Sequence, residues 1–260
     1  MEQQIRAFDI PELVWKIFLN LSAHDILSLC KTSKQLAVYC RDPLLWAAKA
    51  EQDFNFPRRL FSRISSHTPY KEYLYIRNYK PDPGGYLSHF ADIGDLEFVS
   101  WLVRQRGITA NNIHNSLVIS AQNGHLPIVQ LLAQIDPHPG KLFRAIEAAS
   151  YQGHLPVVQW LIKFVEARKA RGIYNEALRI GFISAVNANQ INVAEWLIDK
   201  ITVNKEGILN HSLRVAAVDD DLPMVQWLVE HGATDIQTAL NFGLHAGQTP
   251  VVKYLRSLLQ

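Results

Sequence analysis

The sequence predicts an all-α fold in which a short N-terminal helical module precedes a solenoid of helical repeats. Two observations lead to this prediction. One phrase recurs along the chain, as NGHLPIVQLL at 123–132, GHLPVVQWLI at 153–162 and DDLPMVQWLV at 220–229. Residues 8–48 read differently, because apolar side chains occupy most of their positions and the recurring phrase is missing. The chain therefore contains two kinds of helical module.

The repeats align on a residue pair that ends in leucine in all six copies and begins with tryptophan in four, leucine in one and tyrosine in one. Successive pairs are 30, 29, 36, 31 and 27 residues apart, counted between positions 101, 131, 160, 196, 227 and 254. A period of this size is typical of solenoids, in which a single unit cannot bury its apolar face alone. The pairs are Trp101-Leu102, Leu131-Leu132, Trp160-Leu161, Trp196-Leu197, Trp227-Leu228 and Tyr254-Leu255.

Each unit is predicted to be a pair of helices joined by a turn. Glycine ends the first helix, because it adopts the left-handed conformation without a steric penalty, and asparagine is the next best residue there. Three residues later a proline opens the second helix, where its missing N–H is harmless. The residues expected to end the first helices are Gly94, Gly124, Gly153, Asn189, Asp220 and Gly247. The prolines that open the second helices are Pro127, Pro156, Pro223 and Pro250.

These units resemble ankyrin repeats. The match is carried by NSLVISAQNGHLPIVQLLAQ at 115–134, IEAASYQGHLPVVQWLIKF at 146–164 and VAAVDDDLPMVQWLVEHGA at 215–233. The resemblance covers residues 86–260 and implies about six degenerate repeats. The family's Thr-Pro-Leu-His opening of the first helix is absent from every unit, and the period departs from the usual value of about 33 residues.

Several conspicuous residues of the repeats have structural explanations. Trp160 and its equivalents occupy a core position of the family pattern, so we expect them to be buried. His125 and His154 follow the glycine and fill a turn position, which favours a structural role over metal binding. The acidic run 219–221 lies in an inter-helix turn, where a solvated loop is expected.

The first helix of the N-terminal module begins near Pro11 and has one narrow polar stripe, formed by Glu12, Lys16 and Asn20. The rest of its circumference is apolar, so it needs burial on more than one side. A module of some 40 residues cannot supply that cover by itself. Either the repeats or another protein must cover the row Leu13, Ile17 and Leu21.

Residues 8–48 resemble the F-box. The family's phrases occur in order as Ile10-Pro11-Glu12-Leu13, Ile17-Phe18-Leu19-Asn20-Leu21, Asp25-Ile26-Leu27, Cys30-Lys31 and Asp42-Pro43-Leu44-Leu45-Trp46. The family's Arg-Trp after Cys-Lys is replaced by Thr32-Ser33. The resemblance implies that this module docks on a Skp-type adaptor through Ile10, Pro11, Leu13, Val14, Ile17, Phe18, Leu21, Ile26, Leu27 and Cys30.

Three local expectations complete the N-terminal third. Asp25 is a suitable N-cap for the second helix. Cys30 and Cys40 lie in one apolar segment, where we expect buried, inert thiols of a reducing compartment and no disulfide framework. Residues 49–85 are expected to be a helical linker, with a helix over 68–79 that KPDPGG at 80–85 breaks.

Composition and motifs argue against catalysis. The 26 Lys and Arg nearly balance the 24 Asp and Glu, which gives no strong field for nucleic acid or a membrane. No apolar stretch is long enough to span a bilayer. The chain lacks a phosphate-binding glycine loop, a serine nucleophile elbow and a zinc-protease motif. We expect no enzyme activity, no metal and no cofactor.

The two resemblances together imply the substrate receptor of an SCF-type cullin–RING ubiquitin ligase. The F-box is expected to bind the adaptor, and through it cullin, while the repeats bind a target protein in the cytoplasm, or in the cytoplasm or nucleus of a host cell. Chains of this style are similar to those of large DNA viruses of protists and of intracellular bacteria. The alternatives are an ankyrin scaffold or inhibitor that acts without a ligase, and a nucleic-acid binder whose basic patch is KFVEARKARG at 163–172.

In ankyrin proteins the variable pair just before the helix-ending glycine faces the binding partner. Mapped onto this chain, these positions differ from one repeat to the next, while the Val and Trp-Leu positions hold. Tyr151 is the strongest candidate, because an exposed tyrosine offers a large rigid area with a polar tip. The expected target-binding residues are Asp92, Gln122, Asn123, Tyr151, Gln152, Asn187, Asp219 and His245.

Overall fold

The computed structural model describes residues 10–54, 56, 58, 61, 83–168, 171–247 and 249–260. Every regular element in these ranges is a helix, which confirms the predicted all-α fold. The chain forms two compact units, one of residues 1–86 with 100–108 and one of residues 87–99 with 109–260. No helix in the described ranges is long and apolar enough to cross a membrane.

The N-terminal part of the first unit consists of short helices, two of which begin with a serine N-cap. Ser22 caps the second helix by accepting a hydrogen bond from the backbone N–H of Asp25, and Ser33 caps the third helix in the same way through Leu36. Asp25 is therefore the third residue of its helix and not the N-cap that the sequence suggested. The elements are α1 (Ile10–Asn20), α2 (Ala23–Thr32), α3 (Lys34–Ala37), the 3-10 helix η1 (Tyr39–Arg41) and α4 (Pro43–Phe54).

Large side chains from separate helices form the core of this segment. Trp46 of α4 is fully buried, and its indole N–H donates a 2.9 Å hydrogen bond to the Cys40 carbonyl of η1. Lys49 is also buried, and its ammonium reaches the Leu19 carbonyl at 2.9 Å and the Asp53 carboxylate at 2.8 Å. A buried ammonium must be paired in this way, because an isolated charge in the interior is very costly. These contacts fix α4 against the end of α1.

The two cysteines differ from expectation. Cys30 and Cys40 are joined by a disulfide bond, with their Cα atoms 6.3 Å apart, and both side chains are half-buried. The turn formed by α3 and η1 brings the two residues together, which sequence reasoning did not detect. The expected pair of buried free thiols is therefore wrong. The bond ties the end of α2 to η1.

The junction between the modules is described only in part. The predicted helix over 68–79, and residues 80–82 that were expected to end it, lie outside the described residues. The last three residues of KPDPGG begin the next helix, since Pro83 is the first residue of α6 (Pro83–Asp92) and Gly84 and Gly85 lie in its first turn. Proline is tolerated there because the first-turn N–H groups have no intrahelical partner. α4 likewise continues past residue 48 to Phe54.

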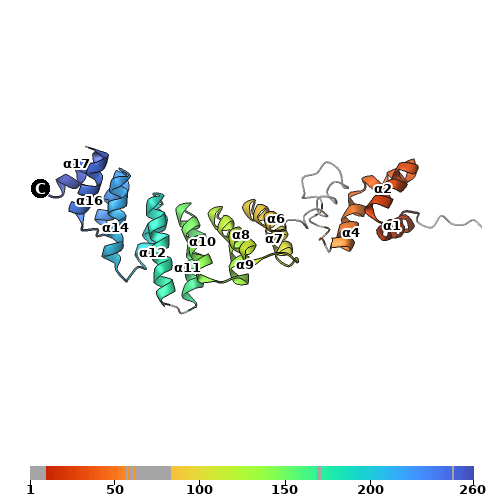
Figure 1. The fold of residues 1–260 in the computed structure, drawn as a ribbon, viewed down its shortest axis with the longest axis horizontal. Helices are drawn as coiled ribbons and strands as arrows, with labels where there is room; N and C mark the ends of the chain where they lie inside the picture. Colours follow the sequence, from red (N-terminus) through yellow and green to blue (C-terminus); the bar gives the residue numbers. More distant parts are fainter. Residues whose placement is uncertain are drawn as a thin grey trace, which may run out of the picture. The chain divides into compact units, whose positions relative to one another are not determined.

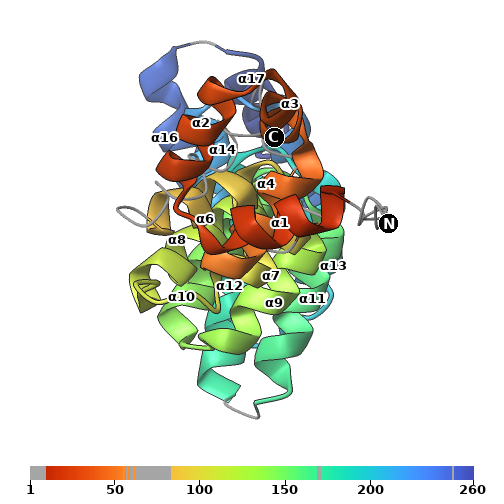
Figure 2. The same cartoon turned by 90° about the vertical axis from the view of Figure 1, so that its right-hand side faces the viewer.

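The second unit is a stack of helix pairs (Figure 1). In the view of Figure 2, α8 and α10 lie on one side of this stack, while α9, α11 and α13 lie on the other, so the first and second helices of the repeats form two layers. The helices from residue 96 onward are α7 (Leu96–Leu102), α8 (Ala110–Gln122), α9 (Leu126–Ile135), α10 (Pro139–Tyr151), α11 (Leu155–Glu166), α12 (Arg171–Asn187), α13 (Ile191–Ile198), α14 (Lys205–Val218), α15 (Leu222–Glu230), α16 (Ile236–Gly243), the 3-10 helix η3 (Leu244–Ala246) and α17 (Pro250–Ser257).

The turn inside each repeat confirms the predicted slot for a left-handed residue. Gly124 and Gly153 have φ angles of 75° and 77°, while Asn189 and Asp220 adopt 54°. Aspartate is one of the few residues besides glycine that visit this conformation, and the Asp220 carboxylate accepts a 3.3 Å hydrogen bond from the Val251 N–H of the next repeat. The acidic turn at 219–221 was expected to be a solvated loop. It also contacts the next repeat through Asp220.

The histidines that follow these glycines hold neighbouring repeats together. The Nε2 atom of His125 lies 2.8 Å from the Asp92 carbonyl, and that of His154 lies 2.8 Å from the Gln122 carbonyl. The imidazole of the next repeat also packs against Gly94 and Gly124, since a Cβ added at Gly124 would lie 2.7 Å from His154, whereas Gly153 faces the side chain of Gln190. The predicted turn role of these histidines is confirmed, and the glycine is required by packing as well as by φ.

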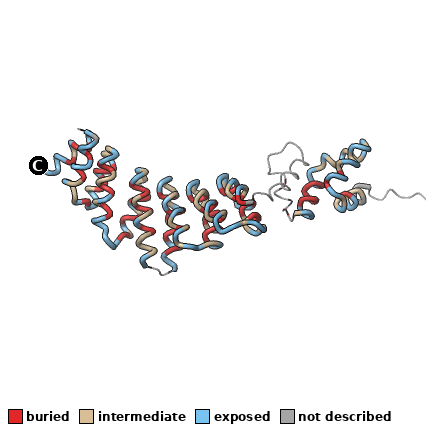
Figure 3. Tube along the Cα trace, viewed as in Figure 1, coloured by how far each residue is buried: buried red, intermediate tan, exposed pale blue. Residues whose placement is uncertain are grey.

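The core of the stack comes from the valine and leucine positions of the motif. Figure 3 shows buried residues running between the packed helices. Trp101 and Trp227 are buried, but Trp160 and Trp196 are only half-buried, so the expectation of full burial is wrong for these two. Each recurring tryptophan precedes the inward-facing leucine by one residue, and its burial differs from repeat to repeat. The fully buried residues are Val129, Val158, Val193, Val225, Val252, Leu132, Leu161, Leu197, Leu228 and Leu255.

Candidate protein-binding surfaces

The residues predicted to bind the adaptor divide into surface and core positions. Ile17 keeps 49% of its surface exposed in spite of its apolar side chain. Phe18 and Ile26, at 2% and 0%, are core residues of the module, because the helical period turns them toward α4 and its neighbours. Four further residues of the predicted surface are half-buried: Val14, Leu21, Leu27 and Cys30. Ile10, Pro11 and Leu13 lie in α1, and their side chains lie outside the described part of the structure.

The residues predicted to bind a target all lie at the ends of first helices. Asp92, Gln122, Tyr151 and Asn187 are the last residues of α6, α8, α10 and α12. Asn123, Gln152 and Asp219 are the C-cap residues that follow α8, α10 and α14, and His245 lies in η3. All eight side chains are exposed. Asn123 and Asp92 are already joined, since the Asn123 amide donates to the Asp92 carboxylate at 2.8 Å.

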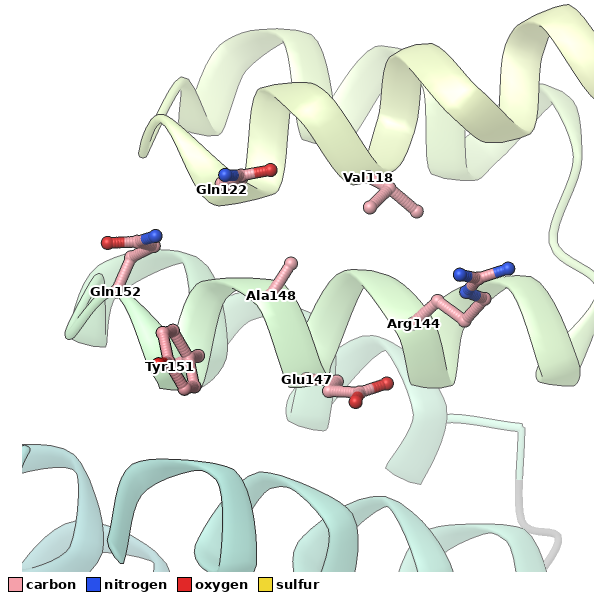
Figure 4. Close-up of a pocket in the computed structure, with 7 residues that line it drawn as sticks. All are labelled: Val118, Gln122, Arg144, Glu147, Ala148, Tyr151 and Gln152. Carbon is pink, nitrogen blue, oxygen red and sulfur yellow. The ribbon is translucent and has the colours of Figure 1, made fainter. Parts of the chain in front are cut away.

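Three of the predicted residues come together around one hollow of about 300 Å³ between α8 and α10 (Figure 4). Gln122 and Gln152 lie at the same end of this hollow, where the two helices terminate. Ala148 points from α10 toward Val118 of α8, so the middle is apolar. Arg144 lies at the other end. The full lining is Val118, Gln122, Arg144, Glu147, Ala148, Tyr151 and Gln152.

Four residues of this hollow were missed by sequence reasoning. Val118, Arg144, Glu147 and Ala148 lie one or two helical turns before the variable pair. A helix presents residues three, four and seven positions apart on one face, so counting back from Tyr151 reaches 148, 147 and 144. That signal was available in the sequence, but the pairing of α8 with α10 was needed to recognise a shared hollow.

The pKa of His114 on α8 reports the charges near this part of the stack. Burial is the largest cause that lowers the pKa of His114, and the cations Lys141 and Arg144 lower this pKa further. Asp136 acts in the opposite direction but is the smallest influence. Because the folded protein favours the neutral imidazole, the positive charge of this region belongs to lysine and arginine at neutral pH.

The next first helix carries charges that satisfy each other. On α12, the Arg179 guanidinium donates to the Glu176 carboxylate in two hydrogen bonds of 2.8 and 2.6 Å. The hydrogen bond from Arg179 is the main cause that lowers the pKa of Glu176. Charges on this face are therefore paired in one repeat, while those around the hollow are not in an ion pair.

The basic stretch 163–172 was the candidate for nucleic-acid binding. Arg168 lies over the ring of Phe164, with its Cζ atom 3.8 Å from the ring centroid, and it also donates to the Phe164 carbonyl at 2.8 Å. Lys169 and Ala170 lie outside the described residues. The described part of this stretch also contains the exposed Lys163 and Arg171. Three cations, one of them already engaged by its own helix, in a chain with nearly balanced charge are little basis for a phosphate-binding surface.

The fold and its surfaces define a class of protein: a binding protein that joins a small helical module to a stack of helical repeats in one chain. Residues 11–50 match the F-box-like family, and residues 213–256 match the family described as Ankyrin repeats (many copies). Both resemblances read from the sequence are thereby confirmed. No curated protein matches the chain. F-box and ankyrin modules are interaction modules, and neither is catalytic.

Proposed function

We propose that this protein is the substrate receptor of an SCF-type cullin–RING ubiquitin ligase. The observation that carries the proposal is the presence of an F-box-like match at 11–50 and an ankyrin match at 213–256 in one chain. In the proposed division of labour, residues 8–48 dock on a Skp-type adaptor, residues 49–85 connect the modules, and residues 86–260 hold the protein to be ubiquitinated.

The proposed receptor performs no covalent chemistry. By holding a target and the ligase at once, it converts their encounter into an intramolecular event with a high effective concentration. This role needs two separate surfaces that can be occupied together. The exposed apolar positions of α1 and α2 supply one, and the exposed ends of the first helices supply the other.

The proposed adaptor surface consists of Val14, Ile17, Leu21, Leu27 and Cys30. Ile17 is the best single test of it, because an isoleucine that packing within its own module leaves half exposed has a reason to be covered by a partner. Phe18 and Ile26 support this surface from the core and are left out of it. Ile10, Pro11 and Leu13 remain proposed contacts on the strength of the F-box resemblance alone.

The adaptor proposal is tested by co-purification of the full chain with a Skp-type adaptor. Ile17→Asp places a charge in the proposed apolar contact and should abolish capture. Leu44→Asp is the matched control, because Leu44 is an apolar residue of the same module with 67% exposure and is not part of the proposed surface. Equal capture by both variants would refute the docking surface. Absence of capture by the unchanged protein would favour the alternative, a scaffold or inhibitor that acts without a ligase.

The proposed target surface is the row of exposed residues at the ends of the first helices: Asp92, Gln122, Asn123, Tyr151, Gln152, Asn187, Asp219 and His245. Tyr151 has 53% of its surface exposed, and Gln122 and Gln152 line the same hollow. Rigid aromatic side chains surrounded by hydrogen-bonding groups are typical of residues that dominate protein interfaces.

The target surface is tested once a ubiquitination target is in hand. Tyr151→Ala, Gln122→Ala and Asn187→Ala are combined in one variant, and the affinity for the target is measured. We expect a loss well above about 0.5 kcal/mol, which is the usual range of neutral surface substitutions. A smaller loss would place the target elsewhere on the repeats while leaving the adaptor proposal intact.

A further inference from the structure

The hollow between α8 and α10 contains two opposite charges that the protein itself does not use. Arg144 and Glu147 lie three residues apart on α10, both are exposed, and both line the hollow. Neither forms a hydrogen bond or an ion pair with another residue in the described ranges. Charges that are adjacent to a concave site and lack a partner are suited to contact a ligand.

The next repeat provides an internal comparison. On α12 the same two residue types, also three positions apart, form the Glu176–Arg179 ion pair at 2.6 Å. The order differs, since the acid precedes the base on α12 and follows it on α10. An acid placed N-terminal to a base is the more favourable arrangement on a helix. The reversed order on α10 leaves Arg144 and Glu147 available to a partner.

The remaining lining residues describe the ligand further. Side-chain amides such as those of Gln122 and Gln152 offer a donor and an acceptor each, which suits the main chain of a peptide. Tyr151 provides an apolar ring face at the same end of the hollow. The planar guanidinium of Arg144, at the opposite end, favours a carboxylate. A volume of about 300 Å³ lies at the lower limit of ligand sites, which fits a short peptide segment.

Spacing relates these groups to an extended chain. Helix residues three apart have Cβ atoms about 5–6 Å apart, while alternate residues of an extended peptide are about 6.6 Å apart on one face. An acid and a base two positions apart in a peptide can therefore meet Arg144 and Glu147 together. Tyr151 lies about 10.5 Å along the helix from Arg144, within reach of a side chain two positions further on.

We propose that the hollow binds an extended segment of the target protein with an acidic residue on Arg144, a basic residue two positions later on Glu147, and an apolar residue two positions beyond it on Tyr151. The amides of Gln122 and Gln152 contact the main chain of this segment. The inference rests on the proposed target surface and names the chemistry of the segment that it recognises.

The test uses two peptides with the same composition. Acetyl-Asp-Ser-Lys-Ser-Leu-amide carries the proposed order of charges, and acetyl-Lys-Ser-Asp-Ser-Leu-amide carries the reverse. Binding to the full chain is measured by NMR titration. Because one exposed ion pair changes an affinity up to about fivefold, we expect the first peptide to bind about three to ten times more tightly than the second.

The decisive variant neutralises both charges, as Arg144→Gln together with Glu147→Gln. It should abolish the preference between the two peptides, because neither side chain can then distinguish their charge order. Arg179→Gln on α12 is the control and should leave the preference as it is. Equal binding of the two peptides to the unchanged protein, or an undiminished preference in the neutralised variant, would overturn the inference. The triple alanine variant distinguishes this inference from the proposed function. If the peptide inference fails but that variant still loses target binding, the proposed target surface remains supported.

Discussion

The N-terminal module and the repeat stack are both built from short helices, but they are stabilised in different ways. In the module, each of these stabilising contacts occurs once. They are the hydrogen bond from the buried Trp46 to the Cys40 carbonyl, the hydrogen bond from the Lys49 ammonium to the Leu19 carbonyl, and one disulfide. In the stack, the same valine, leucine, glycine and histidine contacts recur from unit to unit. A small module depends on a few particular contacts, whereas a repeat array distributes its stability.

This difference matters for the two proposed functions. The stack can vary the residues at the ends of its first helices, because its stability comes from buried positions that the variation does not touch. The module has fewer residues to spare, since Phe18 and Ile26 of the F-box motif are already committed to its core. Its partner surface must therefore come from the few apolar residues that the core leaves outside, of which Ile17 is the most exposed of the proposed set.

The largest expected effect comes from tryptophans in the two regions. Trp46→Ala removes a fully buried side chain and its hydrogen bond, and should lower the free energy of unfolding of the module by about 3–5 kcal/mol. Trp160→Ala, in the stack, removes a half-buried ring stacked on Phe164 and should cost about 1–2 kcal/mol. Calorimetric melting of the full chain measures both. Equal losses would contradict the contrast between the regions.

The second effect separates the regions chemically. Reduction of the Cys30–Cys40 bond, or Cys30→Ser with Cys40→Ser, should destabilise the module by about 2–3 kcal/mol, because the bond closes a loop of about ten residues in the unfolded chain. The stack contains neither of the two cysteines of the sequence and should melt at the same temperature with and without dithiothreitol. Thiol counting under denaturing conditions verifies the bond. If dithiothreitol also changed the melting temperature of the stack, the two regions would not melt independently.

The third effect tests the repeated turn. Gly124→Ala must adopt a φ of 75° and place its Cβ 2.7 Å from the His154 ring, so it should cost about 1–2 kcal/mol. Gly172→Ala is the control within the stack, because a Cβ there meets nothing within 4 Å and lies in the first turn of α12. We expect that variant to be neutral or slightly more stable. Urea unfolding midpoints compare the two.

The smallest effect is a pH dependence confined to the stack. The folded protein lowers the pKa of His114, so the unfolded chain binds more protons near the ordinary value of 6.5. The contribution of His114 is therefore fully present above about pH 6.5 and is lost as the pH falls below it. His114→Gln should make the unfolding midpoint of the stack less sensitive to acid between about pH 7 and 5. An unchanged pH profile would show that other groups set the acid sensitivity.

Much of the stack could be read from the sequence, because its signals are local. A left-handed residue before each second helix, a proline in the first turn and apolar residues at helical spacing are all requirements that a few neighbouring residues satisfy. Asp220 is the one residue at these turn positions that is neither glycine nor asparagine. Its φ of 54° shows that the place in the repeat, and not the preference of the residue type, determined the conformation. The positions at the ends of the first helices were located in the same way.

Other features were decided only by tertiary packing. Cys30 and Cys40 are ten residues apart in sequence, and only the turn through α3 and η1 brings them within bonding distance. Trp160 holds the same position of the motif as Trp227, yet Trp227 is buried and Trp160 is half-buried. Periodicity therefore determined which helices form and which face each one turns inward. The distances between helices, which depend on how whole side chains fit together, determined the disulfide, the burial of each tryptophan and the hollow at Arg144 and Tyr151.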